Sequence, residues 1–138
     1  MTFSRPQKYV PSFESLRVWH DARHLTKDVY RATRAGGFAS DFAFRNQVRR
    51  AALSVMSNIA EGHERGGRKE FRRFLMIAKG SAGEVCSQLY AAEDIGLLDR
   101  VTALRLRQGA RTLSRRIAAL AATLQPQGRT SSSEAVVK

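Results

Sequence analysis

Apolar residues recur every three or four positions through the middle of the chain, and polar residues fill the positions between them. This period is that of an amphipathic α-helix, and no stretch shows the alternation of two that marks a half-buried strand. The pattern predicts four helices, over residues 13–35, 40–62, 68–95 and 100–124. The third is the most regular, with an unbroken apolar seam of Phe71, Phe74, Ala78, Ala82, Val85, Leu89 and Ala92.

Residues at the predicted boundaries favour the start or the end of a helix. Ser40 or Asp41 can cap the second helix, and Asp99 can cap the fourth, because a short polar side chain accepts a hydrogen bond from a free N–H group of the first turn. Gly62 is expected to end the second helix, which leaves residues 63–67 as the turn before the third.

Short connections make neighbouring helices antiparallel, so the predicted fold is all-α, an antiparallel up-down-up-down four-helix bundle over residues 13–124. A length of 138 residues suits one such domain. Residues 1–12 form an N-terminal extension. Residues 125–138 are polar and rich in serine, and we expect this C-terminal tail to be disordered.

Membrane insertion and export are not expected. No run approaches the ~18 apolar residues of a membrane-spanning helix. The first residues include cations but lack the apolar segment of a secretory signal. The lone Cys86 can form no intrachain disulfide, which suits a reducing compartment. We therefore expect a cytoplasmic protein without membrane contact.

Two groups of residues exceed what a single bundle needs. The second predicted helix has apolar residues beside its main seam, and the third has small residues on the side away from its seam. A glycine inside a helix costs up to ~1 kcal/mol relative to alanine, so two of them indicate that another backbone comes close. We predict a homo-oligomer; the alternative is that these are tolerated surface positions. The candidate oligomer interface comprises Phe42, Leu53, Met56, Met76, Gly80, Gly83 and Ser87.

Positive charge is the strongest feature of the composition. The chain has 24 Lys and Arg against 12 Asp and Glu, a formal net charge of +12, which favours polyanionic partners and nucleic acid first. The fourth helix has no acidic residue between Arg100 and Leu124, whereas a solubilising surface intersperses both signs. Aromatic residues fall mostly in the seams, so we expect contacts to phosphates rather than stacking on bases. The candidate nucleic-acid-binding residues are Arg45, Arg49, Arg50, Arg68, Lys69, Arg72, Arg73, Arg107, Arg111 and Arg115.

The segment HDARH, from His20 to His24, superficially resembles a zinc-protease motif, in which two histidines four residues apart bind the metal. On a helical wheel, however, both histidines lie opposite the seam and among cations, which disfavour a metal dication. We predict a solvated polar face there, with no metal and no cofactor.

Glu61, His63 and Glu64 could form an acid/base cluster. A helix end and a turn would not hold them as rigidly as catalysis demands, so no catalytic residue is predicted. The nearby glycines make no phosphate-binding loop, because no G-K-[ST] sequence follows them.

Several segments, taken in order, resemble one protein family. They are FESLRVWHDA at residues 13–22, then Gln47, SNIAEG at residues 57–62, EFRRFLMIAKGSAGE at residues 70–84, and the run at residues 89–98. In this order the chain is similar to the four-helix-bundle proteins found within intervening sequences of bacterial 23S ribosomal RNA genes. The accessory variability determinant of diversity-generating retroelements is related to the same family.

The resemblance implies an antiparallel four-helix bundle that assembles into a ring-like pentamer, with a basic surface and no known enzymatic activity. In the retroelement branch it implies binding of nucleic acid and of a reverse transcriptase. The family signature falls on Asn58, Glu61, Gly62, Gly80, Ser81 and Glu84, and the resemblance gives these residues no catalytic task.

Three functional hypotheses follow from the sequence. The leading one is a non-enzymatic homo-oligomer whose Arg-rich surface contacts RNA or DNA phosphates. The second is an interaction scaffold for an acidic protein or a reverse transcriptase. The third is a nuclease or hydrolase that uses Glu61, His63 and Glu64.

Overall fold

A computed structural model describes residues 12–125, and all regular structure within that range is helical. The predicted all-α class is confirmed. Predictions for residues 1–11 and 126–138 lie outside the described residues. In chain order the elements are a 3-10 helix η1 (Phe13–Ser15), α1 (Arg17–Ala32), α2 (Gly37–Ser40), α3 (Phe42–Arg65), α4 (Arg68–Asp94) and α5 (Arg100–Ala122).

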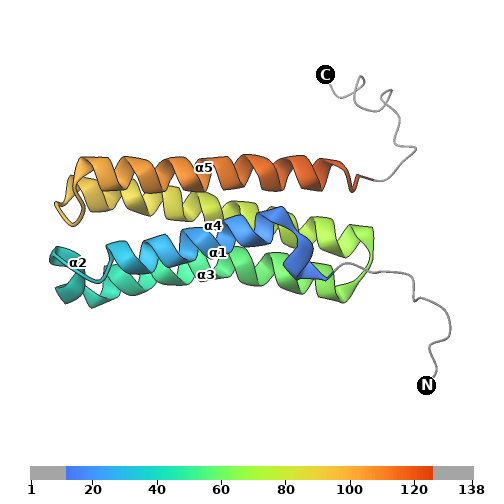
Figure 1. Cartoon of the computed structure of the whole chain (residues 1–138), viewed down its shortest axis with the longest axis horizontal. Coiled ribbons are helices and arrows are strands. Elements are labelled where there is room, and N and C mark those ends of the chain that lie inside the picture. The colour runs from blue at the N-terminus through green and yellow to red at the C-terminus, as the bar shows by residue number, and fades with distance from the viewer. Residues whose placement is uncertain (1–11, 126–138) are drawn as a thin grey trace.

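The four long helices lie side by side as a helical bundle (Figure 1). Helices α3 and α5 each pack against both α1 and α4, so α1 and α4 are diagonal to one another across the bundle. A polar contact bridges each adjacent pair: Thr26 Oγ1 to the Ala52 carbonyl at 3.2 Å, Ser54 Oγ to Ser81 Oγ at 2.8 Å, Arg107 to Glu93 at 2.8 Å, and Arg116 to Asp21 at 2.8 Å.

The predicted apolar seams meet along the bundle axis. Alanine and valine contribute much of the buried surface, and small side chains let neighbouring helices approach closely. In α4 every residue of the predicted seam is buried except Phe71, which is half-buried and packs against the same core. The fully buried seam residues include Val29, Val55, Ala82 and Ile117, one from each long helix.

Both predicted aspartate caps are present. Asp41 Oδ1 accepts a hydrogen bond from the Phe44 backbone N–H at 3.1 Å and opens α3. Asp99 Oδ2 accepts one from the Thr102 backbone N–H at 3.0 Å and opens α5. Hydrogen bonds with Thr102 lower the pKa of Asp99 below its ordinary value; the bond with the Thr102 side chain has the larger effect and the bond with the Thr102 backbone the smaller.

The predicted end of the second helix at Gly62 is wrong, because α3 continues to Arg65. Gly62 is buried, and a Cβ atom there would lie 2.5 Å from the Cβ of Phe74. The absence of a side chain at Gly62 therefore allows α4 to pack closely on α3. The turn is made instead by Gly66 and Gly67, whose φ angles of 77° and 90° favour glycine.

The first predicted helix is shorter than expected. Its backbone is extended at Leu16, which separates η1 from α1, and α1 ends at Ala32. The chain then turns at Gly36, with φ of 65°, into the short α2, which buries Phe38 completely against the core.

Candidate nucleic-acid interface

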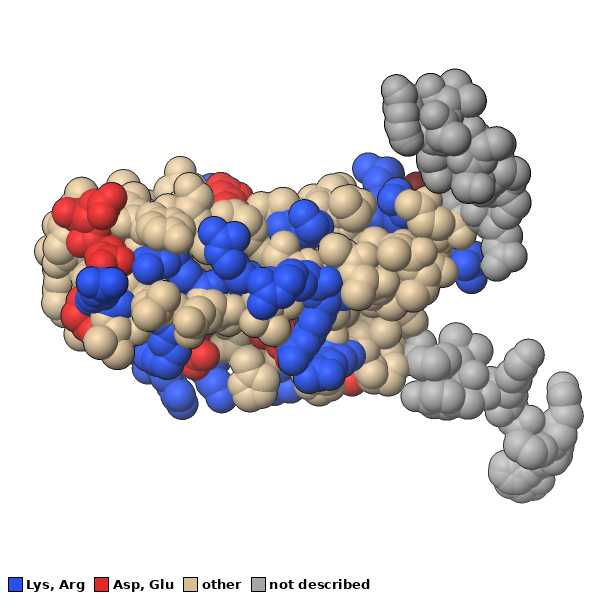
Figure 2. Space-filling view, turned by 90° about the horizontal axis from the view of Figure 1, so that it is seen from above, with Lys and Arg blue, Asp and Glu red and all other residues tan. Residues whose placement is uncertain are grey.

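Lys and Arg side chains form a band across the face of the molecule on the side of α5 (Figure 2). Arg111 and Arg115 are exposed on α5, and Lys69 is exposed at the start of α4, where Arg72 is half-buried. We refer to Lys69, Arg72, Arg111 and Arg115 as the α4/α5 surface.

A shallow groove runs between α4 and α5 at the middle of this surface. Ala82, Gly83 and Cys86 line it from α4, and Arg111 and Arg115 stand on its α5 side. Its volume is about 100 Å³, so it is a shallow depression and not a cavity for a small molecule. The small residues of α4 leave the floor smooth, while both cations stay at its edge.

A second hollow lies at the start of α4. Lys69 and Arg72 line it together with the apolar side chains of Met76 and Leu124. Arg68 donates a hydrogen bond to the Thr123 carbonyl at 2.9 Å and thereby ties the start of α4 to the end of α5. The α4/α5 surface therefore has two hollows, the shallow groove along α4 and α5 and this one at the start of α4.

The four cations of the α4/α5 surface are not neutralised by neighbouring acids. Within residues 12–125, ion pairs are made by Arg65, Arg73, Arg107 and Arg116. Within the same range, no carboxylate oxygen lies within 4.0 Å of a charged nitrogen of Lys69, Arg72, Arg111 or Arg115. Their charge is thus available to an external anion.

Arg107 does not belong to the exposed basic surface, which corrects its place among the candidate phosphate contacts. Its side chain is buried, donates to Glu93 Oε1 at 2.8 Å, and lies 4.0 Å from the ring centroid of Tyr90. The hydrogen bond with Glu93 raises the pKa of Arg107 above its ordinary value. Arg107 joins α4 to α5, and its long alkyl stem allows that burial.

The cations at the start of α3 also make contacts within the chain. Arg49 donates to Thr33 Oγ1 at 2.8 Å and lies over the ring of Tyr30 at 4.3 Å. Arg45 lies 4.7 Å from the ring centroid of Phe42. The third cation of this helix, Arg50, is exposed. Because Arg49 packs toward α1, these cations are not continuous with the α4/α5 surface.

Sequence reasoning missed Tyr90. Its side chain is 48% exposed at the edge of α4 and is not buried in the apolar seam. The signal was its spacing, because Tyr90 lies three residues after Ser87 and seven after Gly83, on the outward side of an α-helix.

Residues of the family signature lie where α3 meets α4. Asn58 donates to the Ser54 carbonyl at 2.8 Å and to Ser54 Oγ at 3.0 Å. Ser54 Oγ in turn lies 2.8 Å from the buried Ser81 Oγ. With Gly62 one turn beyond Asn58, these residues fix the distance and the register between two helices, which is a structural role.

A comparison with protein families now identifies the chain. A family model described as 23S rRNA-intervening sequence protein matches residues 14–119. The chain belongs to this family. The match begins in η1 and reaches into the last turns of α5, so it covers nearly the whole bundle. No match was found among curated proteins.

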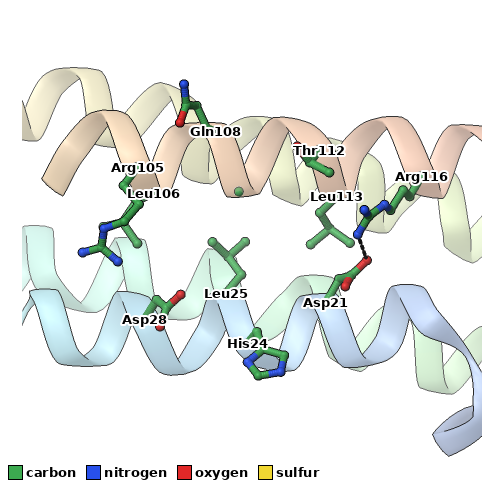
Figure 3. Close-up of a pocket in the computed structure, with 11 residues that line it drawn as sticks. Asp21, His24, Leu25, Asp28, Arg105, Leu106, Gln108, Thr112, Leu113 and Arg116 are labelled. Carbon is green, nitrogen blue, oxygen red and sulfur yellow. Dashed lines mark hydrogen bonds and ion pairs between the residues drawn. The ribbon is translucent and has the colours of Figure 1, made fainter. Parts of the chain in front are cut away.

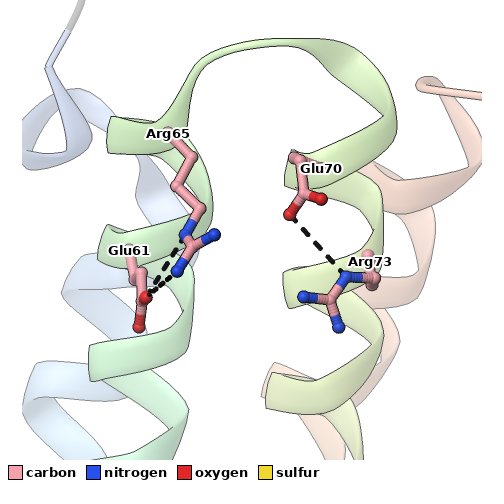
Figure 4. Close-up of polar contacts among 4 residues, drawn as sticks. All are labelled: Glu61, Arg65, Glu70 and Arg73. Carbon is pink, nitrogen blue, oxygen red and sulfur yellow. Dashed lines mark hydrogen bonds and ion pairs between the residues drawn. The ribbon is translucent and has the colours of Figure 1, made fainter.

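In this intervening-sequence family member, the acidic residues near the α3–α4 turn are paired with arginines (Figure 4). Glu61 binds Arg65 at 2.9 Å, and Glu70 lies 3.7 Å from Arg73. Both arginines also pack on the ring of Phe74, each at 4.9 Å from its centroid. Each carboxylate is therefore engaged by an arginine of its own helix, as exposed pairs at this spacing often are.

The prediction that His63 and Glu64 lie in the turn between helices is wrong, because both belong to the last turn of α3. The His63 ring meets Phe71 edge-on, with centroids 5.4 Å apart. Glu61 is occupied by Arg65. Two of the three groups are therefore engaged by neighbouring side chains of the chain itself.

A further hollow of this family member lies between α1 and α5 (Figure 3). It has a volume of about 360 Å³, and Asp21 and Arg116 pair across it at 2.8 Å. Asp28 on α1 and Arg105 on α5 line it further along, so acids of one wall face cations of the other. The opposed charges stabilise the packing of the first long helix on the last.

The two histidines of α1 have different neighbours. His20 Nε2 is 2.6 Å from the Glu14 carbonyl, and His24 lines the α1/α5 groove. Among the described residues, no group of three or more His, Cys, Asp and Glu side chains could hold a metal ion. In the same part of the chain, no helix is long and apolar enough to cross a membrane.

Proposed function

We propose that this member of the 23S rRNA-intervening sequence protein family is a non-enzymatic, homo-oligomeric protein that binds RNA or DNA through its phosphates. The observation that carries the proposal is the α4/α5 surface, where Lys69, Arg72, Arg111 and Arg115 face outward or line a hollow without an acidic partner in residues 12–125. A surface that only keeps a protein soluble mixes both signs of charge.

The placement of the α4 cations also supports phosphate binding. Arg68, Lys69 and Arg72 stand in the first turns of α4, where the helix dipole is positive and cations lower the stability of the helix. A phosphate at this end would interact favourably with both the cations and the dipole.

Self-association is the second part of the proposal. Gly80 and Gly83 lie inside α4, yet a Cβ atom at either would meet nothing within 4 Å in the chain. Leu53 on α3 and Met76 on α4 are 40% and 41% exposed. A second copy packing here would cover both side chains and account for Gly80, whereas Gly83 lines the α4/α5 groove. The resemblance implies that the four helices run up-down-up-down and that the bundles assemble into a ring-like pentamer.

Fluorescence anisotropy with a labelled RNA tests the nucleic-acid proposal. If four phosphates are neutralised, affinity should fall about 50- to 150-fold when monovalent salt is raised from about 50 to about 200 mM, because counterions are released on binding. Absent or salt-insensitive binding would contradict the proposal. Intact RNA after long incubation is the expected result for a non-enzymatic protein, with Glu61→Gln/His63→Ala as the comparison.

A second candidate function is a scaffold for an acidic protein segment, of which a contact with a reverse transcriptase is one version. The hollow at the start of α4 favours it, because apolar Met76, Ile77 and Leu124 line that hollow beside the cations. An acidic amphipathic helix could place its apolar face there. Binding that tolerates salt but is lost in Ile77→Asp, a variant of a residue outside the proposed subunit contact, would favour the scaffold over the nucleic-acid surface.

A further inference from the structure

We propose that the nucleic acid bound by the α4/α5 surface is single-stranded and that Tyr90 stacks on one of its bases. This inference rests on the proposed function and specifies its ligand. It departs from the expectation of phosphate contacts alone, because the expected burial of the aromatic residues does not hold at Tyr90.

Tyr90 is held in place without being covered. The guanidinium of Arg107 lies 4.0 Å from its ring centroid, and Arg107 is only 8% exposed and paired with Glu93 at 2.8 Å. The cation therefore fixes one side of the ring from within the protein, while 48% of Tyr90 remains exposed. An aromatic ring that is already ordered loses little conformational entropy when a base stacks on it.

Tyr90 lies close to the cations of the α4/α5 surface. Cys86 lies one turn before Tyr90 on α4, and Arg111 lies one turn after Arg107 on α5; both line the shallow groove. The Tyr90 and Arg107 pair therefore stands at the end of that groove. From Tyr90 to Arg72, α4 covers about 27 Å at ~1.5 Å per residue. This length suits a strand of at least about four nucleotides.

We infer a single strand because Tyr90 can stack only on a base whose face is accessible. In a duplex both faces of every base are stacked on neighbours, so an exposed tyrosine on a convex helix surface could meet only the sugar-phosphate backbone. In a single strand the base can turn outward and lie on the ring. Such a contact changes affinity about 5- to 150-fold when the aromatic side chain is removed, and it tolerates any base.

The test compares a labelled single strand of about 12 uridines with a duplex of the same length, by anisotropy at low salt. Tyr90→Leu should weaken binding of the single strand by about 5-fold or more and leave duplex binding unchanged. Tyr90→Phe keeps the ring and should bind like wild type, and Tyr90→Trp should bind the single strand more tightly. Tyr30→Leu is the matched control, because Tyr30 also has an arginine over its ring, Arg49 at 4.3 Å, but lies on α1, away from the α4/α5 surface.

Different outcomes would contradict different parts of the proposal. Equal binding of wild type and Tyr90→Leu to the single strand, or equal loss on the duplex, would overturn stacking while leaving the phosphate surface intact. A changed particle mass of Tyr90→Leu in light scattering would place Tyr90 in a subunit contact and overturn the assignment. Absence of salt-sensitive binding by the wild type would overturn the proposed function itself, and this inference with it.

Discussion

Gly62 and Gly109 both stand inside a long helix, but only Gly62 has a packing reason to lack a side chain. A Cβ at Gly62 would lie 2.5 Å from Phe74 of α4, whereas a Cβ at Gly109 would meet nothing within 4 Å. Gly62 thus sets the separation of α3 and α4 next to the network of Asn58, Ser54 and Ser81. A single residue here governs the packing of two helices.

Gly62→Ala should lower the free energy of unfolding by about 1–3 kcal/mol, because the added methyl group overpacks the α3–α4 contact. Gly109→Ala is the matched control and should raise it by up to about 1 kcal/mol, because alanine favours the helix. Urea unfolding followed by circular dichroism measures both. A neutral or stabilising effect of Gly62→Ala would show that α4 can move away without cost.

The sequence could not reveal that Arg107 is buried and that Tyr90 is exposed. Periodicity places both at the edge of an apolar seam, where a residue can face either the neighbouring helix or the solvent. Which side is covered depends on the separation of α4 and α5, and that is a property of the packed pair. Arg107 reaches Glu93 and is buried, and Tyr90 remains exposed beside it.

At the scale of the helices, the sequence predicted most of what the structure contains. An unbroken period of three to four residues identified the four long helices, and the caps at Asp41 and Asp99 follow from local hydrogen bonding. The end of α3 was misplaced because Gly62 was interpreted as a helix terminator, whereas its role is to contact another helix. The short α2 was not predicted, since four residues are too few to show a period.

The Asp99 cap predicts an acid-sensitive start of α5. Its folded-state pKa is lowered, so its charged form stabilises the fold above about pH 4, and this contribution is lost as the pH falls through the lowered folded-state pKa. Asp99→Asn retains a capping group that does not titrate. The stability advantage of wild type over Asp99→Asn should therefore shrink between pH 6 and pH 3 in urea unfolding. A pH-independent difference would contradict this role.

At the scale of the whole molecule, we propose two outward surfaces of residues 12–125 as contact sites for partners. One is apolar and includes Leu53 on α3 and Met76 on α4; the other is the basic α4/α5 surface (Figure 2). Both include residues on the outward side of α4, so the proposed contacts for assembly and for nucleic acid are neighbours on one helix. A variant that weakens nucleic-acid binding must therefore be checked for its mass.

Light scattering should give wild type a mass of several times 15.4 kDa. The double variant Leu53→Asp/Met76→Asp should reduce that mass toward one chain, because buried unpaired carboxylates oppose association. Val101→Asp is the matched control, since Val101 is 75% exposed on α5 and lies outside the proposed contact. A wild type that is already monomeric when dilute would contradict the proposed oligomer.

The salt dependence of RNA binding tests the central claim most directly. Arg111→Gln/Arg115→Gln removes two cations of the α4/α5 surface, and Lys27→Gln/Arg31→Gln removes two exposed cations from α1, the helix diagonal to α4. The first variant should reduce the slope of log affinity against log salt by about two, and the second should leave it near the wild-type value. Equal slopes for both variants, or an unchanged slope in the first, would contradict a phosphate-binding surface on α4 and α5.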